Sequence, residues 1–69
     1  MKLSARNQLK GTIVEIQEGA VNAIVKINVG NDNILTADIT LQSVKDLGLA
    51  VGKEVVAVIK STSVMVGVE

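Results

Sequence analysis

Three short stretches of this sequence concentrate side chains that donate hydrogen bonds or carry positive charge. They are Ser4–Arg6 (SAR), Thr40–Ser43 (TLQS) and Lys60–Ser63 (KSTS), and the first contains the only arginine. Arginine offers a planar fork of N–H groups, lysine a point charge, and each hydroxyl one donor. A tetrahedral oxyanion held away from water needs donors on all sides and positive charge to offset its own. These are the residue types that a small-oxyanion site uses, although nothing in their spacing brings the stretches together.

Each stretch also has an ordinary structural explanation. Arg6 fits a surface charge, Thr40 and Ser43 fit helix capping, and Ser61–Ser63 fits a turn. A cation site could also be sought at Asn31–Asn33 (NDN), which offers oxygen ligands but lacks the acidic residues and spacing of a calcium loop. A hairpin turn explains that segment better.

Catalysis has little support in the sequence. The chain contains no His and no Cys, which excludes the usual nucleophile pairs as well as disulfides and ordinary zinc sites. Lys60 and Ser61 are adjacent, and adjacent strand residues point to opposite faces of a sheet. We therefore do not expect an enzyme.

The overall composition argues against nucleic acids and membranes as partners. Seven basic residues balance seven acidic ones, and the chain has no Phe, Tyr or Trp. Single-stranded nucleic acids are held by a positive groove and by aromatic side chains that stack on the bases. The longest uninterrupted apolar run, Val55–Ile59, is far too short to span a bilayer. With no cysteine and no apolar leader, we expect a cytoplasmic location.

The length predicts one small domain, residues 1–69, that needs partners to complete its core. A chain of this size buries only about 60% of the surface that its unfolded form exposes. Here 48% of the residues are hydrophobic, yet aromatic side chains, which bury the largest areas, are missing. We therefore expect a homo-oligomer.

Alternation of apolar and polar residues predicts β-structure over most of the chain. Apolar residues occupy every second position in 21–29 and in 35–41, the period of half-buried strands. Gly30–Asn33 between them favours a hairpin turn. Further strands are predicted over 10–17 and 53–60, with a short last strand over 63–68. Segment 53–60 is apolar on both faces, so we expect both to be covered.

One segment, 41–49, departs from this alternation. Leu41, Val44 and Leu47 recur at helical spacing, Thr40 or Ser43 can cap the start, and Gly48 fits the residue after the end. Five strands with a helix between the third and fourth predict an all-β fold with one short helix. The expected architecture is a small five-stranded barrel like that of oligonucleotide-binding (OB) domains, with its strands completed by subunit association.

Two motifs resemble those of a known family. SARNQLKG at Ser4–Gly11, combined with VIKSTSVM at Val58–Met65, resembles the molbindins, small cytoplasmic molybdate-binding proteins with an OB-like fold. The resemblance covers essentially the whole chain. It implies a hexamer built as a trimer of dimers, which holds molybdate or tungstate at subunit interfaces and uses no organic cofactor.

The resemblance also assigns site residues. It implies that the anion is contacted by Ser4, the backbone of Ala5, Arg6, Lys60 and Ser61, with Thr40 and Ser43 added from the partner subunit. Asn7 and Gln8 are candidates for a second class of site near the threefold axis. The function implied is reversible oxyanion binding for intracellular storage or homeostasis. The alternatives are a molybdate-sensing regulatory oligomer and a single-stranded nucleic-acid-binding OB module.

Overall fold

The computed structural model describes all residues, 1–69. Its elements are β1 (Asn7–Glu18), β2 (Asn22–Asn28), β3 (Ile34–Thr40), α1 (Leu41–Asp46), β4 (Glu54–Ile59) and the 3-10 turn η1 (Ser61–Ser63). The strands pair antiparallel in one curled sheet, in the order β3-β2-β1-β4. The predicted class, all-β with one short helix, is confirmed.

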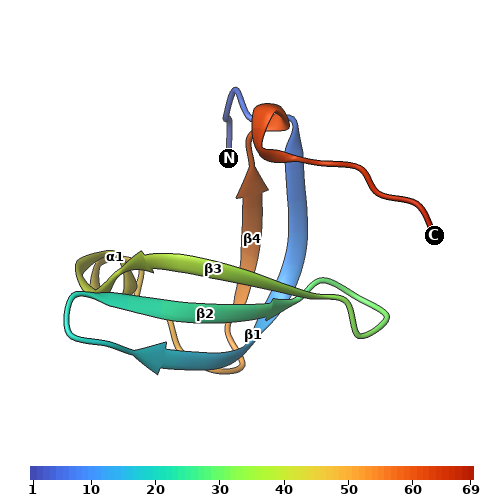
Figure 1. Ribbon diagram of the computed structural model, residues 1–69. Coiled ribbons are helices and arrows are strands. Elements are labelled where there is room, and N and C mark those ends of the chain that lie inside the picture. The colour runs from blue at the N-terminus through green and yellow to red at the C-terminus, as the bar shows by residue number, and fades with distance from the viewer.

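β1 pairs with two strands and bends between the two pairings. Its first half pairs with β4 and its second half with β2. The register against β2 shifts between Ile13 and Glu15, which leaves Val14 as the extra residue of a β-bulge. Bulges bend a strand and increase its twist. The β1–β4 ribbon consequently stands across the β2–β3 hairpin instead of continuing in its plane (Figure 1).

Gly11 lies just before this bend, where two layers approach closely. A Cβ atom there would lie 2.6 Å from Ile27 Cγ2 and 2.7 Å from the carbonyl oxygen of Asn28. Since the backbone oxygen cannot swing away, Gly11→Ala should lower the free energy of unfolding by about 1–3 kcal/mol. Chemical denaturation measures this, with Thr12→Ala at the neighbouring exposed position as the control. Equal midpoints for the two variants would contradict the steric argument.

The hairpin turn predicted at Gly30–Asn33 is confirmed. Gly30, Asn31 and Asp32 have positive φ angles of 113°, 50° and 60°, a region that Gly, Asn and Asp tolerate best. The Val29 N–H donates to the Asn33 carbonyl and the Asn33 N–H donates to the Gly30 carbonyl, both at 2.9 Å. Turn chemistry therefore accounts for this polar segment.

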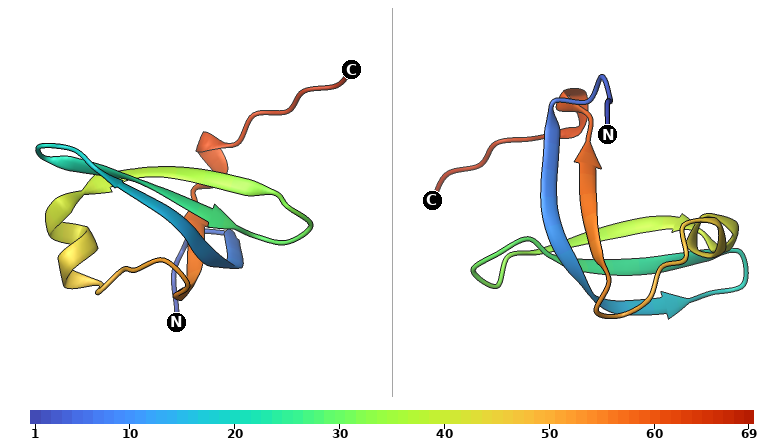
Figure 2. Two further views of the ribbon diagram at one scale, coloured as in Figure 1. Left: turned by 90° about the horizontal axis from the view of Figure 1, so that it is seen from below. Right: turned by 180° about the vertical axis from the view of Figure 1, so that it is seen from behind.

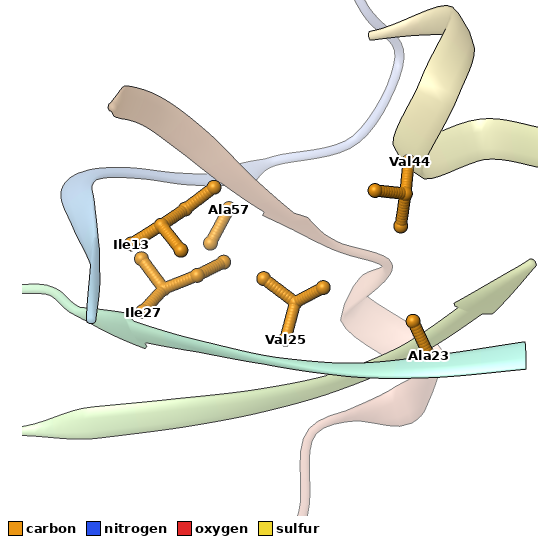
Figure 3. Packing of buried hydrophobic residues seen from close by; sticks show 6 residues of the cluster. All are labelled: Ile13, Ala23, Val25, Ile27, Val44 and Ala57. Carbon is orange, nitrogen blue, oxygen red and sulfur yellow. The ribbon is translucent and has the colours of Figure 1, made fainter. Parts of the chain in front are cut away.

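A small aliphatic core lies on the inner side of the curled sheet (Figure 3). It consists of Ile13, Ala23, Val25, Ile27, Val44 and Ala57. Three consecutive alternate positions of β2 are in this set, so the predicted inward face of that strand is confirmed. Val44 brings α1 against the β2 end of the core, where it points toward Ala23 (Figure 3).

The helix is shorter than the predicted segment 41–49, because it ends at Asp46. The signal for its end is confirmed: Gly48 has φ 61° and its N–H donates to the Lys45 carbonyl at 3.1 Å. At its start Thr40 is the N-cap, one of the two residues predicted for that role. The Asp46 carboxylate accepts a hydrogen bond from the Gln42 side-chain amide at 2.8 Å.

The predicted fifth strand over 63–68 does not form in the single chain. Ser61–Ser63 is a 3-10 turn, and the following residues leave the body of the molecule (Figures 1 and 2). Their apolar side chains are almost fully exposed: Met65 at 93%, Val66 at 92% and Val68 at 95%. A strand needs an edge to pair with, and this segment reaches none in its own chain.

The sheet is consequently an open barrel. β3 and β4 each pair on one side only, so both present a free edge. A hollow of about 500 Å³ is lined by 14 residues, 13 of them hydrophobic, including Leu35, Ala37 and Ile39 of β3 and Val55, Ala57 and Ile59 of β4. On the outer face of β4, Val56 and Val58 remain 37% and 43% exposed. The expected cover over both faces of segment 53–60 is therefore absent within one chain.

Candidate oxyanion-binding site

The pairing of β1 with β4 brings two of the three donor-rich stretches together. Asn7 is the partner of Ile59 at the end of the ladder. The residues just beyond, Arg6 on one strand and Lys60 on the other, therefore leave the sheet side by side. The N-terminal segment and η1 both lie at this end of the β1–β4 ribbon (Figure 1 and the right view of Figure 2). We call residues Ser4–Arg6 and Lys60–Ser61 the cradle.

The cradle carries positive charge with no carboxylate to neutralise it. The one ion pair of the chain joins Lys26 to Glu15 at 3.9 Å, far from this end of the ribbon. No acidic residue occurs in 1–14 or in 55–68. Two cations brought together without a counter-charge repel each other, and a bound anion relieves that repulsion.

The cradle also has unused backbone donors. The first hydrogen bond of η1 runs from the Ser63 N–H to the Lys60 carbonyl at 2.9 Å. The N–H groups of Ser61 and Thr62 are therefore not used by the turn itself. Thr62 lies within the KSTS stretch but was not assigned a role from sequence, because only the backbone conformation shows that its N–H points out of a turn.

In the single chain the cradle is open to solvent. Ser4, Arg6, Lys60 and Ser61 are exposed, and Ala5 is partly buried. An exposed ion pair contributes little, because water screens it and competes for its donors. These residues alone therefore do not enclose a bound anion.

Thr40 and Ser43 do not join the cradle within one chain. They lie where β3 passes into α1, at the end of the hairpin remote from η1 (Figure 1). The Ser43 N–H donates to Thr40 Oγ1 at 3.0 Å, and Thr40 Oγ1 donates to Ser43 Oγ at 2.9 Å. Helix capping thus occupies the Thr40 hydroxyl in both directions, whereas the hydroxyl proton of Ser43 stays free to be donated.

Asn7 and Gln8 lie at the start of β1, three residues earlier than the strand predicted over 10–17. The Asn7 amide Nδ2 donates to the Ile59 carbonyl at 3.2 Å, and the Gln8 amide Nε2 donates to the Ala5 carbonyl at 2.9 Å. Both side chains are thus engaged with backbone on either side of the cradle.

A second, polar hollow of about 870 Å³ lies elsewhere, between β1, the edge of β4 and the hairpin turn. Its lining includes Lys10, Asn28, Asp32 and Glu54. No cradle residue lines either hollow.

None of the helices is long and apolar enough to cross a membrane.

Known proteins resemble this chain along its whole length. Residues 3–66 match the TOBE domain family. A probable molybdenum-pterin-binding protein of Haemophilus influenzae is 61% identical over 69 residues, which is 100% of both chains.

Two solved structures share the fold. MopII from Clostridium pasteurianum, in an apo form, matches with a TM-score of 0.91 and 45% identity, over 97% of this chain and 100% of that one. ModG, described as a cytoplasmic molybdate-binding protein and solved with molybdate bound, matches with a TM-score of 0.83 and 56% identity, over 88% of this chain and 43% of that one. This chain therefore belongs to the TOBE domain family and is a molbindin-type member of it, as its SARN and IKST motifs predict.

Proposed function

We propose that this protein binds molybdate, and tungstate with it, reversibly as an intact oxyanion. The observation that carries the proposal is the cradle, where Arg6 and Lys60 lie just beyond the last pair of the β1–β4 ladder, beside hydroxyl and backbone donors and with no acidic residue in 1–14 or 55–68. The molybdate-bound ModG, 56% identical, supports this choice of anion. Residues 1–69 act as a single binding domain, and a dianion is held by charge-assisted hydrogen bonds without any covalent step.

A second copy of the chain completes the site. The cradle is exposed, and Thr40 and Ser43 lie too far away to reach it in the same chain. A neighbouring copy can place its free Ser43 hydroxyl, oriented by Thr40, against the open side of the cradle. Closed point-group assemblies are the usual form of homo-oligomers, and a hexamer built as a trimer of dimers fits the family.

The C-terminal segment provides the means of assembly. Residues 64–68 carry apolar side chains that nothing covers, and the hollow between the free edges of β3 and β4 is apolar and unfilled. A C-terminal strand from another copy would pair with a free edge and close the barrel. This would cover the exposed apolar side chains and fill the open hollow in one step. The five-stranded barrel is then a property of the assembly.

Size gives selectivity over sulfate. A rigid ring of donors set for the larger anion leaves a smaller one with unmade hydrogen bonds. Phosphate is partly protonated near neutral pH, and its proton would face a site made of donors. Molybdate is therefore preferred over both.

Calorimetric titration with molybdate, tungstate, sulfate and phosphate tests the proposal. We expect saturable binding of the first two and much weaker binding of the others. Molybdate binding no tighter than sulfate would refute the function, and clear binding of single-stranded oligonucleotides at physiological salt would favour the OB-module alternative.

Ser43→Ala tests whether the site is shared between copies. The variant should bind molybdate roughly ten- to hundredfold more weakly, the range for one hydrogen bond to a charged group. Mixed assemblies of Ser43→Ala and Arg6→Ala chains should regain about a quarter of the sites at wild-type affinity, because half of the cradles and half of the Ser43 donors are intact. No recovery on mixing would place both residues in one chain's site.

A molybdenum–pterin compound is the second candidate ligand, because the Haemophilus influenzae relative is named for one. A pterin ring is flat and is commonly held by stacking, yet this chain has no aromatic side chain. Titration with molybdate alone separates the two ligands, since the oxyanion site needs no pterin.

The cellular role that we propose is storage or buffering of the anion in the cytoplasm, the compartment named for ModG. Binding, without chemical change, is the whole activity. A sensing oligomer that passes the signal to another protein is the alternative, and a partner retained only by the molybdate-loaded protein would favour it.

A further inference from the structure

Two neighbouring amide side chains tie down both halves of the cradle. Asn7 Nδ2 donates to the carbonyl of Ile59, the residue before Lys60, at 3.2 Å. Gln8 Nε2 donates to the carbonyl of Ala5, the residue before Arg6, at 2.9 Å. Each amide thus holds the backbone immediately preceding one of the two cations.

We propose that Asn7 and Gln8 are positioning residues of the oxyanion site, which set the backbones of Arg6 and Lys60 at the separation that the anion requires. The inference rests on the proposed function and deepens it. It replaces the second-site role suggested for these two residues by the family resemblance with a role in the principal site.

The N-terminal half has little else to hold it. None of the backbone hydrogen bonds of turns, loops and caps involves residues 1–6. The bond from Gln8 is therefore the one side-chain hydrogen bond given to Ser4–Arg6, and it folds this segment back onto the start of β1. Without it the Arg6 backbone would sample many conformations, and binding would have to restrict them.

The other half depends on the last pair of the β1–β4 ladder. Asn7 and Ile59 are the final partners, and the chain turns into η1 directly after Lys60. The bond from Asn7 adds a side-chain link to the last carbonyl of β4. It prevents fraying at the end of the ladder, which fixes the direction in which the backbone continues to Lys60.

Two residues are needed because adjacent strand positions face opposite ways. Asn7 is partly buried, on the same side of β1 as Ile13, whereas Gln8 is exposed on the outer side. One amide can therefore reach β4 and the other the N-terminal segment, but neither can reach both.

Gln8→Met and Asn7→Ala test the proposal, with Gln17→Met as the matched control. Gln17 is exposed at the far end of the same strand and makes no side-chain hydrogen bond. Molybdate and sulfate are titrated calorimetrically into the assembled wild type and variants, and thermal unfolding and assembly size are recorded for each.

We expect each variant to bind molybdate roughly three- to tenfold more weakly, the range for one neutral hydrogen bond, with unchanged stoichiometry and a smaller molybdate-to-sulfate ratio. Gln17→Met should match the wild type. Fewer anions per chain at unchanged affinity would make Asn7 and Gln8 ligands of a separate site and overturn the proposal. A loss of thermal stability with unchanged affinity and ratio would reduce them to structural residues and overturn it too. If the wild type itself failed to bind molybdate, the proposed function would fall and this inference with it.

Discussion

Replacing Arg6 with alanine should remove most of the affinity for molybdate while the oligomer survives. Truncating one charge-assisted partner in an enclosed site costs on the order of 2–5 kcal/mol, which is about thirtyfold to several-thousandfold in Kd. Arg6 makes no ion pair within the chain and is exposed in it, so its loss leaves the core intact. Calorimetry gives the affinity and size-exclusion chromatography the assembly state.

Two further variants separate the guanidinium from its charge. Lys2→Ala removes the same net charge from the same N-terminal segment and should change affinity little, because an exposed charge outside the cradle is screened. Arg6→Lys keeps the charge without the planar fork and should bind with intermediate affinity. If Arg6→Ala and Lys2→Ala weakened binding equally, the affinity would depend only on the total positive charge of the N-terminal segment. Arg6 would then not be a residue of the site.

Local features of this fold could be predicted from sequence because neighbouring residues decide them. The positive-φ turn at Gly30–Asn33 and the helix end at Gly48 both follow from residues within a few positions. The inward face of β2 follows from its alternation of apolar and polar residues, which identifies the buried face whichever element covers it. These features need no knowledge of the distant chain.

Features that depend on distant contacts could not be predicted in this way. The bulge at Val14 lies two residues after Thr12, where β1 changes partner, and alternation in one strand does not reveal which strands pair with it. The close approach at Gly11 depends on Ile27, sixteen positions away. The early start of β1, at Asn7, depends on β4 being beside it.

The cradle likewise has a part that could be predicted from neighbouring residues and a part that depends on distant contacts. That Ser4–Arg6 and Lys60–Ser61 carry the right donors could be seen from residue types, but their convergence required the β1–β4 register. The separation of Thr40 and Ser43 from that cradle is likewise a result of the fold. In the shared site that we propose, each half looks like ordinary surface, capping or turn chemistry, so the single sequence supports both interpretations.

Deleting the C-terminal segment should abolish both assembly and molybdate binding, although it removes no residue of the cradle. A chain ending at Ser63 loses Val64, Met65, Val66 and Val68, and burial of each such side chain contributes about 1.5–3 kcal/mol. Without the segment the apolar hollow between β3 and β4 stays open, and each cradle loses the neighbour that supplies Ser43. Analytical ultracentrifugation should therefore show a smaller species that no longer titrates with molybdate.

The point variant Val66→Asp applies the same test without shortening the chain. Val66 is 92% exposed in the single chain, so the substitution would be harmless if the segment stayed in solvent. Buried against an apolar neighbour, an aspartate would instead lose its hydration without gaining a partner and would destabilise the assembly. Removing Glu69 alone is the control and should leave assembly and binding unchanged. A Val66→Asp protein of wild-type size and affinity would show that the barrel is not closed by this segment.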